Sequence, residues 1–447
     1  MSQCDCATCV GTSADTARKS ACATVLLAIA FMLCPGVARA EDTLHLKLPE
    51  AQRLAVQNNP YITAAPLNAA AAAQVPAQYS SAYQPTVFGS VTGVGADNGS
   101  RLAAGGLNNP VVYDRLGSGL SVSQLLTDFG RTSNLVAAAK FHASAQDQQT
   151  ALSKAQVLLA TARAYFAVLR AESVLKVANE TVAARQLVVD QVTLLAKSHL
   201  KSALDVSFAN VNLGEARLLL AGAQNDIKSA TAELATAMGI PGQTNFVLAD
   251  EPLPDLLPNK VDPLIQEAIS KRPDLAGLRL EQTAAERNYQ AEKALVFPTI
   301  GVVGTAGLVP GGVAAIPGRY GAIGVNVTVP LFNGGLFKAR RSEADLRSRA
   351  AEQRVNDLRN QVVRDVRVAY LNAETAYERV GLTDQLLQQA QLAMELAQRR
   401  YDLGLSSIVE LSQAQLNLTS AQIATASAKY DYQAQRSVLS YQVGALR

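Results

Sequence analysis

Apolar residues recur three and four positions apart along two proline-free stretches of the chain, 131–197 and 336–403. Such spacing places apolar side chains along one face of a helix and is typical of a coiled-coil seam. At a rise of 1.5 Å per residue, a helix of about 67 residues is roughly 100 Å long, which indicates a rod rather than a compact globular domain. The seam positions of the second stretch are Ala351, Val355, Leu358, Val362, Val366, Tyr370, Ala373, Tyr377 and Val380.

Shorter stretches alternate apolar with small or polar residues, and this period of two predicts strands at about 85–96, 116–126, 298–308 and 321–331. Runs near ten residues with one apolar face have the length and period of transmembrane barrel strands. A soluble sheet of two hairpins would show the same alternation. The apolar face of the second pair comprises Ile300, Val302, Gly304, Ala306 and Leu308 from one strand and Val325, Val327, Val329 and Leu331 from the other.

The chain contains an internal repeat, because similar groups of residues recur at two fixed separations in residue number, or offsets. At an offset of 213, Asn59-Pro60 corresponds to Arg272-Pro273. At an offset of 205, the matched groups are Ala164-Tyr165 with Ala369-Tyr370, Leu204-Asp205-Val206 with Val409-Glu410-Leu411, and Met238-Gly239 with Val443-Gly444. The difference of eight residues between the offsets is a deletion that falls in a loop between Pro298 and Leu331.

Each copy is predicted to contain a helix, two strands, a long helix and a short helix. The leading helices cover about 49–82 and 263–296, and the short helices cover about 203–238 and 408–444. Segments 203–238 and 263–296 are each near 35 residues, so two such segments stacked end to end match one long helix. The predicted domains are the first repeat at 41–240, a linker at 241–261 and the second repeat at 262–447.

Residues 1–40 are predicted to be an export signal peptide. Arg18-Lys19 precede an apolar run at 21–33, and Ala38-Arg39-Ala40 supplies a small-x-small cleavage pattern. The apolar run is too short to span a bilayer, which needs about 20 residues. All five cysteines lie before residue 35, so the mature chain would have neither disulfides nor thiolate ligands. Lipidation of Cys34 is the alternative, but the bulky Leu33 before it favours cleavage after Ala40.

The composition offers little for catalysis or nucleic-acid binding. A formal charge of +3 gives no reason to expect a nucleic-acid partner. None of the three histidines has a metal-ligand partner at suitable spacing, and the glycines at 301–312 are not followed by Gly-Lys-Ser/Thr. The sequence therefore predicts no enzyme, no cofactor and no metal site.

The strand count requires more than one chain in a membrane. Four strands cannot close a barrel, because single-chain barrels begin at about eight strands. An open sheet edge in hydrocarbon leaves unpaired N–H and C=O groups at a cost of several kcal/mol each. Several copies must therefore share one barrel, although this reasoning does not fix their number.

The chain closely resembles the TolC-like outer-membrane efflux protein family. The resemblance rests on the repeat, on the prolines before the strands, on the Leu-Phe-Asn-Gly-Gly turn at 331–335 and on the Tyr-Asp-Leu-Gly-Leu-Ser-Ser turn at 401–407. It implies a mainly α fold with a transmembrane β-barrel portion, in which a homotrimer forms a twelve-stranded barrel in outer-membrane lipid and a helical tunnel in the periplasm. The implied partners are a periplasmic adaptor protein and an inner-membrane pump of the RND, ABC or MFS type.

The resemblance also implies that the helix turns at the periplasmic tip dock the adaptor and form a gate. An acid and a tyrosine that form a closing hydrogen bond in the family correspond to Asp205 and Tyr401. The family's arginine, two positions after the tip glycine, corresponds to Ser406 here. The family's ring of acids one helical turn apart, which forms a cation-attracting constriction, corresponds to Glu410 and the neutral Gln413. The candidate residues are Ser202, Asp205, Tyr401, Gly404, Ser406, Ser407, Glu410 and Gln413.

Simpler roles and functions compete with this interpretation. Asp205 could be an acid that caps a helix, and Tyr401 could be a seam residue. An exported coiled-coil stalk without conduction is the alternative function, and it predicts an uninterrupted heptad without strand pairs. Within the duct interpretation, tripartite efflux and type I protein secretion stay open.

Overall fold

The structure is a computed structural model that describes residues 44–97, 115–242, 245–254, 257–258, 260–312 and 317–446. The predicted signal peptide, 1–40, lies outside the described residues. The chain divides into a small unit, Met1–His45 with Asn245–Val247, and a large unit, Leu46–Thr244 with Leu248–Arg447. The short strands β1 (Leu44–Leu46) and β4 (Phe246–Leu248) form a two-stranded sheet.

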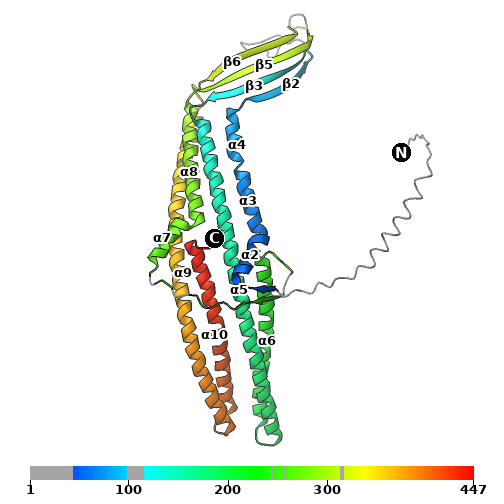
Figure 1. Ribbon diagram of the computed structural model, residues 1–447, viewed down its shortest axis with the longest axis vertical. Coiled ribbons are helices and arrows are strands. Elements are labelled where there is room, and N and C mark those ends of the chain that lie inside the picture. Colours follow the sequence, from blue (N-terminus) through cyan, green and yellow to red (C-terminus); the bar gives the residue numbers. More distant parts are fainter. Residues whose placement is uncertain are drawn as a thin grey trace, which may run out of the picture. The chain divides into compact units, whose positions relative to one another are not determined.

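The large unit contains the predicted repeat of helices and strands (Figure 1). Its first copy contains α2 (Leu48–Asn58), α3 (Pro60–Ala72), α4 (Val75–Ser80), η1 (Ser81–Tyr83), β2 (Thr86–Val94), β3 (Arg115–Thr127), α5 (Arg131–Lys197) and α6 (Ala203–Ala237). Its second copy contains α7 (Asp262–Lys271), α8 (Pro273–Lys293), η2 (Ala294–Val296), β5 (Thr299–Gly312), β6 (Arg319–Thr328), α9 (Leu336–Asp402) and α10 (Ile408–Val443).

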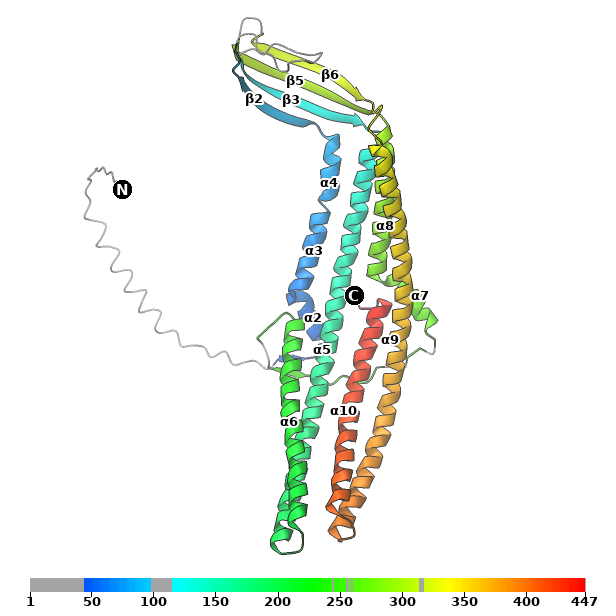
Figure 2. The ribbon, with the colours of Figure 1, turned by 180° about the vertical axis from the view of Figure 1, so that it is seen from behind.

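The two long helices, α5 and α9, each contain 67 residues. Each follows a glycine in the left-handed region, Gly130 at φ 94° and Gly335 at φ 83°. Such a φ strains any residue with a Cβ, so these glycines let the chain turn from the sheet into a helix. Within the large unit, the sheet lies at one end of the long helices and the α5–α6 and α9–α10 turns lie at the other (Figure 2).

The four-stranded sheet has the order β2-β3-β5-β6, and all its pairs are antiparallel. Because opposed residues share a face, the register sorts the side chains into two sets. The apolar set contains Val87, Val91, Leu120, Val122, Val302, Leu308, Ile323 and Val325. The opposite, mainly small and polar set contains Thr86, Ser90, Thr92, Ser121, Ser123, Thr305, Asn326 and Thr328. The apolar face is bare in the single chain, since Val91 is 78% and Ile323 is 84% exposed.

Two details of the strands differ from the sequence prediction. The last strand was expected at 321–331 but ends at Thr328, before Val329 and Pro330, because proline cannot donate a ladder hydrogen bond. β5 was expected to end at 308 and continues to Gly312. The connection 313–318 is shorter than 95–114, as the difference between the two offsets predicts.

The leading helices are broken, whereas the sequence pattern predicted continuous helices at 49–82 and 263–296. Asn59 and Arg272, each before a proline, have extended backbones at ψ 119° and ψ 123°. A proline disfavours the helical conformation of the residue before it, so the first segment breaks between α2 and α3 and the second between α7 and α8. The first segment breaks again between α3 and α4, at Ala73 and Gln74. The expected stacking of 203–238 with 263–296 is also wrong, because α6 meets the α2–α3 junction instead.

That junction shows that the repeat extends to individual contacts. The Asn59 side-chain amide donates to the carbonyl of Ala237 at the end of α6, at 2.9 Å. The Arg272 guanidinium lies 3.5 Å from the carbonyl of Gln442 at the end of α10 and donates to its side chain at 2.6 Å. Each short helix therefore stacks on the broken leading segment of its own copy, beside one long helix (Figures 1 and 2).

The fold disfavours the coiled-coil stalk, because a strand pair interrupts the helices in both copies. None of the helices in the described ranges combines the length and the apolarity needed to cross a membrane.

Candidate functional site

The predicted site residues lie at the two helix tips, which have equivalent backbone geometry. His199 at φ 58° and Gly404 at φ 72° occupy the left-handed position that ends α5 and α9. Both turns close with a bond from the next amide, Leu200 to the Leu195 carbonyl at 2.9 Å and Leu405 to the Arg400 carbonyl at 2.8 Å. This C-terminal motif satisfies carbonyls that the helix leaves free.

Serines cap the helices that follow the two turns. The Ser202 hydroxyl accepts from the Asp205 amide at 3.2 Å, and the Ser202 amide donates to the Asp205 carboxylate at 2.9 Å. This reciprocal pair is a capping box, and the negative charge also favours the helix N-terminus. Ser407 accepts from the Glu410 amide at 3.4 Å, but the Glu410 carboxylate pairs with Arg400 at 3.1 Å instead of returning to the cap.

An apolar cluster joins the two hairpins near the tips. Val192 from α5, Tyr401 from α9, and Ile408 and Leu411 from α10 are buried together, and Val206 from α6 packs against them. Five residues after the α10 cap, the Asn212 amide donates to the Ser412 hydroxyl at 2.6 Å, which links α6 directly to α10. The cluster and this bond hold the α5–α6 hairpin against the α9–α10 hairpin.

The predicted hydrogen bond between Asp205 and Tyr401 is not formed. Tyr401 is 6% exposed, and its buried hydroxyl has no hydrogen-bond partner among the described residues. The Asp205 carboxylate is instead occupied by the Ser202 amide and hydroxyl. Burial, together with the negative charges of Asp205 and Asp402, raises the pKa of Tyr401. The hydroxyl therefore stays protonated at neutral pH.

The remaining candidates lie on the second tip but form no single constellation. The Ser406 hydroxyl is buried without a partner in the described part of the chain. Gln413 is exposed and donates to Asn417 at 3.0 Å along its own helix. The role of Glu410 and Gln413 in an acidic constriction stays a prediction, since that feature depends on how several chains meet.

The sequence interpretation missed one residue of this site, Lys201. Its ammonium group lies 3.9 Å from the ring centroid of Tyr401. The repeat could have identified it, because the offset of 205 makes Lys201 the equivalent of Ser406, where the family's arginine was expected.

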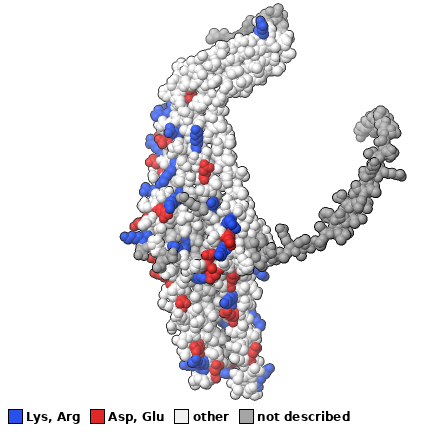
Figure 3. All heavy atoms as spheres, in the orientation of Figure 1, with Lys and Arg blue, Asp and Glu red and all other residues white. Residues whose placement is uncertain are grey.

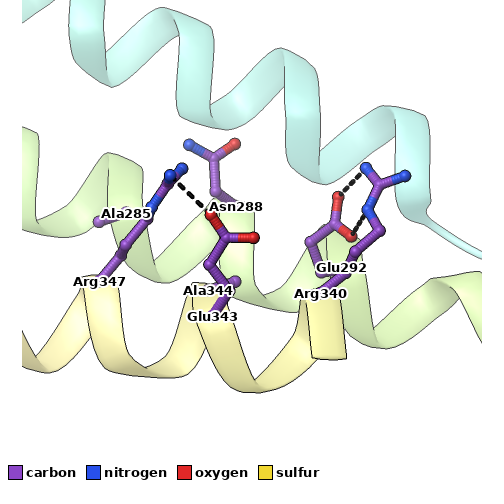
Figure 4. A pocket seen from close by; sticks show the side chains of 7 residues that line it. All are labelled: Ala285, Asn288, Glu292, Arg340, Glu343, Ala344 and Arg347. Carbon is purple, nitrogen blue, oxygen red and sulfur yellow. Dashed lines mark hydrogen bonds and ion pairs between the residues drawn. The ribbon is translucent and has the colours of Figure 1, made fainter. Parts of the chain in front are cut away.

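A polar depression between α8 and α9 is lined by Ala285, Asn288, Glu292, Arg340, Glu343, Ala344 and Arg347 (Figure 4). Arg340 pairs with Glu292 at 2.8 Å and Arg347 with Glu343 at 2.6 Å, so its four charged groups neutralise one another. The described ranges hold no group of three or more His, Cys, Asp or Glu arranged to bind a metal.

Charged side chains are scarce on the sheet and intermingled in sign on the helices (Figure 3). The four strands contain two charged residues, Arg115 and Arg319. These residues begin β3 and β6, which run parallel to each other, so both lie at the same end of the strands. The strands thus form a band without internal charge, with basic residues at one border.

Comparisons with known proteins identify the family of this chain. The family model described as outer membrane efflux protein matches residues 52–240 and 264–445. The chain is 25% identical over 418 residues to the outer membrane efflux protein BepC of Brucella suis, covering 91% of this chain and 87% of the relative. It is 25% identical over 368 residues to the outer membrane protein TolC of Salmonella enteritidis, covering 79% and 74% respectively.

Solved structures show the same fold. The outer membrane protein VceC of Vibrio cholerae superposes with a TM-score of 0.76 at 20% identity, covering 89% of this chain and 96% of that chain. The open state of the MtrE outer membrane channel of Neisseria gonorrhoeae gives 0.71 at 22% identity, covering 89% and 88%. The fold is that of the channel-tunnel subunits of the outer membrane. The chain belongs to the outer membrane efflux protein family.

Proposed function

We propose that three copies of this chain form the exit duct of a tripartite efflux pump, with the helical tunnel in the periplasm and a gate at the tips. The observation that carries the proposal is the sheet, which has one apolar face, one mainly small and polar face and two open edges. Such a sheet fits a barrel with lipid outside and water inside. Three sheets of four strands give the twelve strands that the family implies.

The dimensions of the sheet fit a membrane. β2, β3, β5 and β6 contain 9, 13, 14 and 10 residues, and a transmembrane strand needs about 9–11. Charges begin where the strands begin or end, at Arg115 and Arg319 on one side and at Asp128 and Arg131 on the other. The uncharged band therefore matches the hydrocarbon layer in height.

Exposed apolar rows on the helices support assembly from copies of one chain. On α6, Leu204, Val211 and Leu218 recur every seven residues and are 64%, 59% and 75% exposed. Leu396 on α9 and Leu403, the residue that follows the end of α9, are also seven apart and exposed. A heptad row needs a partner helix, and copies of the chain supply one at each flank.

Cysteine cross-linking tests the barrel, because the chain has no cysteine after residue 34. Ser90→Cys on edge strand β2 and Ala322→Cys on edge strand β6 lie on the same face. A short bis-maleimide should join them between chains and give a covalent trimer in outer-membrane fractions. The matched control, Ser121→Cys with Ala322→Cys, has both residues in one row across β5 and should cross-link within a chain. A monomer or dimer from the edge pair would reject the trimer.

Conduction and cargo need separate measurements. Purified protein should form ion-conducting channels in planar bilayers, and an absence of channels would reject the duct. Cells that lack the chain should accumulate an efflux dye. Loss of a secreted protein with unchanged dye accumulation would instead indicate a type I secretion duct, and would overturn efflux as the cargo route. The adaptor and inner-membrane pump would dock through the same tips, and cross-linking from Ser407→Cys should capture the adaptor.

A further inference from the structure

One contact joins the two tip turns directly. Lys201 lies in the turn between α5 and α6, and its ammonium lies over the ring of Tyr401 in the last turn of α9, 3.9 Å from the centroid. A cation over an aromatic face is attracted by the ring's negative potential, more strongly when water is excluded. We propose that this cation–π contact is the latch that holds the two turns together at the tip and keeps the channel closed there.

The ring, and not the hydroxyl, makes the polar contact of Tyr401. Its hydroxyl is buried without a hydrogen-bond partner in the described ranges, and the Asp205 carboxylate is used within its own turn by Ser202. Lys201 is partly buried, and no ion pair of the described residues engages its ammonium. The lysine is therefore free to hold the ring.

The two turns carry different residues at the equivalent position, and only the first turn carries a cation there. Lys201 and Ser406 are equivalent at the offset of 205, so the position that holds a serine in the second turn holds a lysine in the first. The latch thus crosses from one copy of the repeat to the other. This inference rests on the proposed function, because a latch has a consequence only if the tip gates a channel.

The latch acts at the tip alone. The apolar cluster, to which Tyr401 itself belongs, also holds the hairpins together, and so does the Asn212–Ser412 bond further along the helices. Loss of the lysine should therefore loosen the turns without separating the hairpins. A cation–π contact of this kind shifts a two-state ratio by about 5- to 30-fold, so we expect an open-to-closed ratio raised by that factor in each subunit.

Single-channel recording of the full purified assembly tests the latch. Lys201→Gln removes the charge and should raise the open probability, and Lys201→Arg keeps a cation over the ring and should behave like the wild type. Tyr401→Phe keeps the ring and removes the hydroxyl, so it should also stay closed, while Tyr401→Leu should open. Lys197→Gln removes the same charge from an exposed lysine nearby and serves as the matched control. Heat resistance in SDS checks that each variant assembles.

The outcomes separate the latch from the proposed function. If Tyr401→Phe opens the channel as much as Tyr401→Leu, the hydroxyl and not the ring holds the tip, and the latch is refuted. If Lys201→Gln conducts like the wild type, or if Lys197→Gln has the same effect as Lys201→Gln, the contact plays no part in closure. If the wild type, Lys201→Gln and Tyr401→Leu all form no channel although they assemble, the proposed function itself is rejected.

Discussion

Removing the hydroxyl of Tyr165 should release the linker that follows the first repeat. Tyr165 is fully buried in α5, and its hydroxyl lies 2.6 Å from the carbonyl of Ala249 and 3.1 Å from that of Leu46. The Ala249 amide donates to the same Leu46 carbonyl at 2.9 Å. One buried hydroxyl therefore pins both the start of the large unit and its linker.

The substitution Tyr165→Phe keeps the ring in place and leaves the Ala249 carbonyl without its donor. A buried acceptor left unsatisfied costs about 1–3 kcal/mol. The repeat provides a matched control, because the equivalent Tyr370 donates to the Pro258 carbonyl at 2.8 Å in an exposed setting. Water can replace that bond, so Tyr370→Phe should cost about 0.5 kcal/mol or less.

Hydrogen–deuterium exchange of the detergent-solubilised assembly measures both costs. When opening is fast and reversible, exchange increases in proportion to the opening constant. Peptides that contain Ala249 should therefore exchange about 5- to 150-fold faster in Tyr165→Phe, as the 1–3 kcal/mol requires. Peptides that contain Leu257 should change about twofold in Tyr370→Phe. Equal effects of the two variants, or unchanged exchange at Ala249, would refute the reasoning from burial.

The same hydroxyl predicts a dependence on alkaline pH. Burial raises the pKa of Tyr165 above its ordinary value, with smaller contributions from the charges of Glu251 and Asp250. The docked state therefore holds its proton more tightly than the released state. Linker docking is fully stable below about pH 10, the ordinary pKa of tyrosine, and weakens as the pH rises above it. Tyr165→Phe should remove this dependence, and a wild-type linker whose protease resistance is constant from pH 9 to 11 would contradict it.

Three further substitutions and one control test the packing, each by the fraction of assembled protein that survives heating in SDS. Gly239→Ala forces a Cβ to 2.6 Å from the carbonyl carbon of Asn58 at φ 72° and should cost about 2–5 kcal/mol; wild-type heat resistance would refute this. Gly307→Ala forces a Cβ to 2.5 Å from backbone and ring atoms in the sheet, whereas Gly324→Ala meets nothing within 4 Å, so only the first should weaken the assembly. Arg272→Gln breaks an ion pair in which the arginine is 8% exposed, and it should cost about 3–5 kcal/mol; a loss below 1 kcal/mol would show that the pair is solvated.

Long-range periodicity predicted the long helices and the internal repeat of this protein well. The seam pattern located α5 and α9, and the offset of 205 made the two tip turns equivalent in the sequence. These features depend on many residues with the same period, so single exceptions do not obscure them. The proline effect at Asn59 and Arg272 is local, and the Ala-rich composition around it wrongly suggested continuous helices.

The site was predicted less well, because neighbouring groups compete for the same atoms. The resemblance assigned Asp205 to Tyr401, but Ser202 is three residues away and captures the carboxylate in a capping box. The Ser-x-x-Asp pattern at 202–205 is visible in the sequence, and a local cap forms at little entropic cost compared with a contact between hairpins. The Lys201 contact has no such local pattern, and only the repeat connects it to Ser406.

The two tip turns have the same backbone conformation but different side chains, and this difference determines which turn supplies the contact between the hairpins. In the first turn, the acid closes its own cap and leaves Lys201 to contact the ring of Tyr401 in the other hairpin. In the second, Glu410 pairs with Arg400 within its own hairpin, and Ser406 offers no charge to the neighbouring turn. The charge that crosses between the hairpins therefore comes from the lysine alone among these tip groups. Removing that one positive charge, by substitution or by acetylation of the lysine, should loosen the contact between the two tip turns, while each turn keeps its own cap.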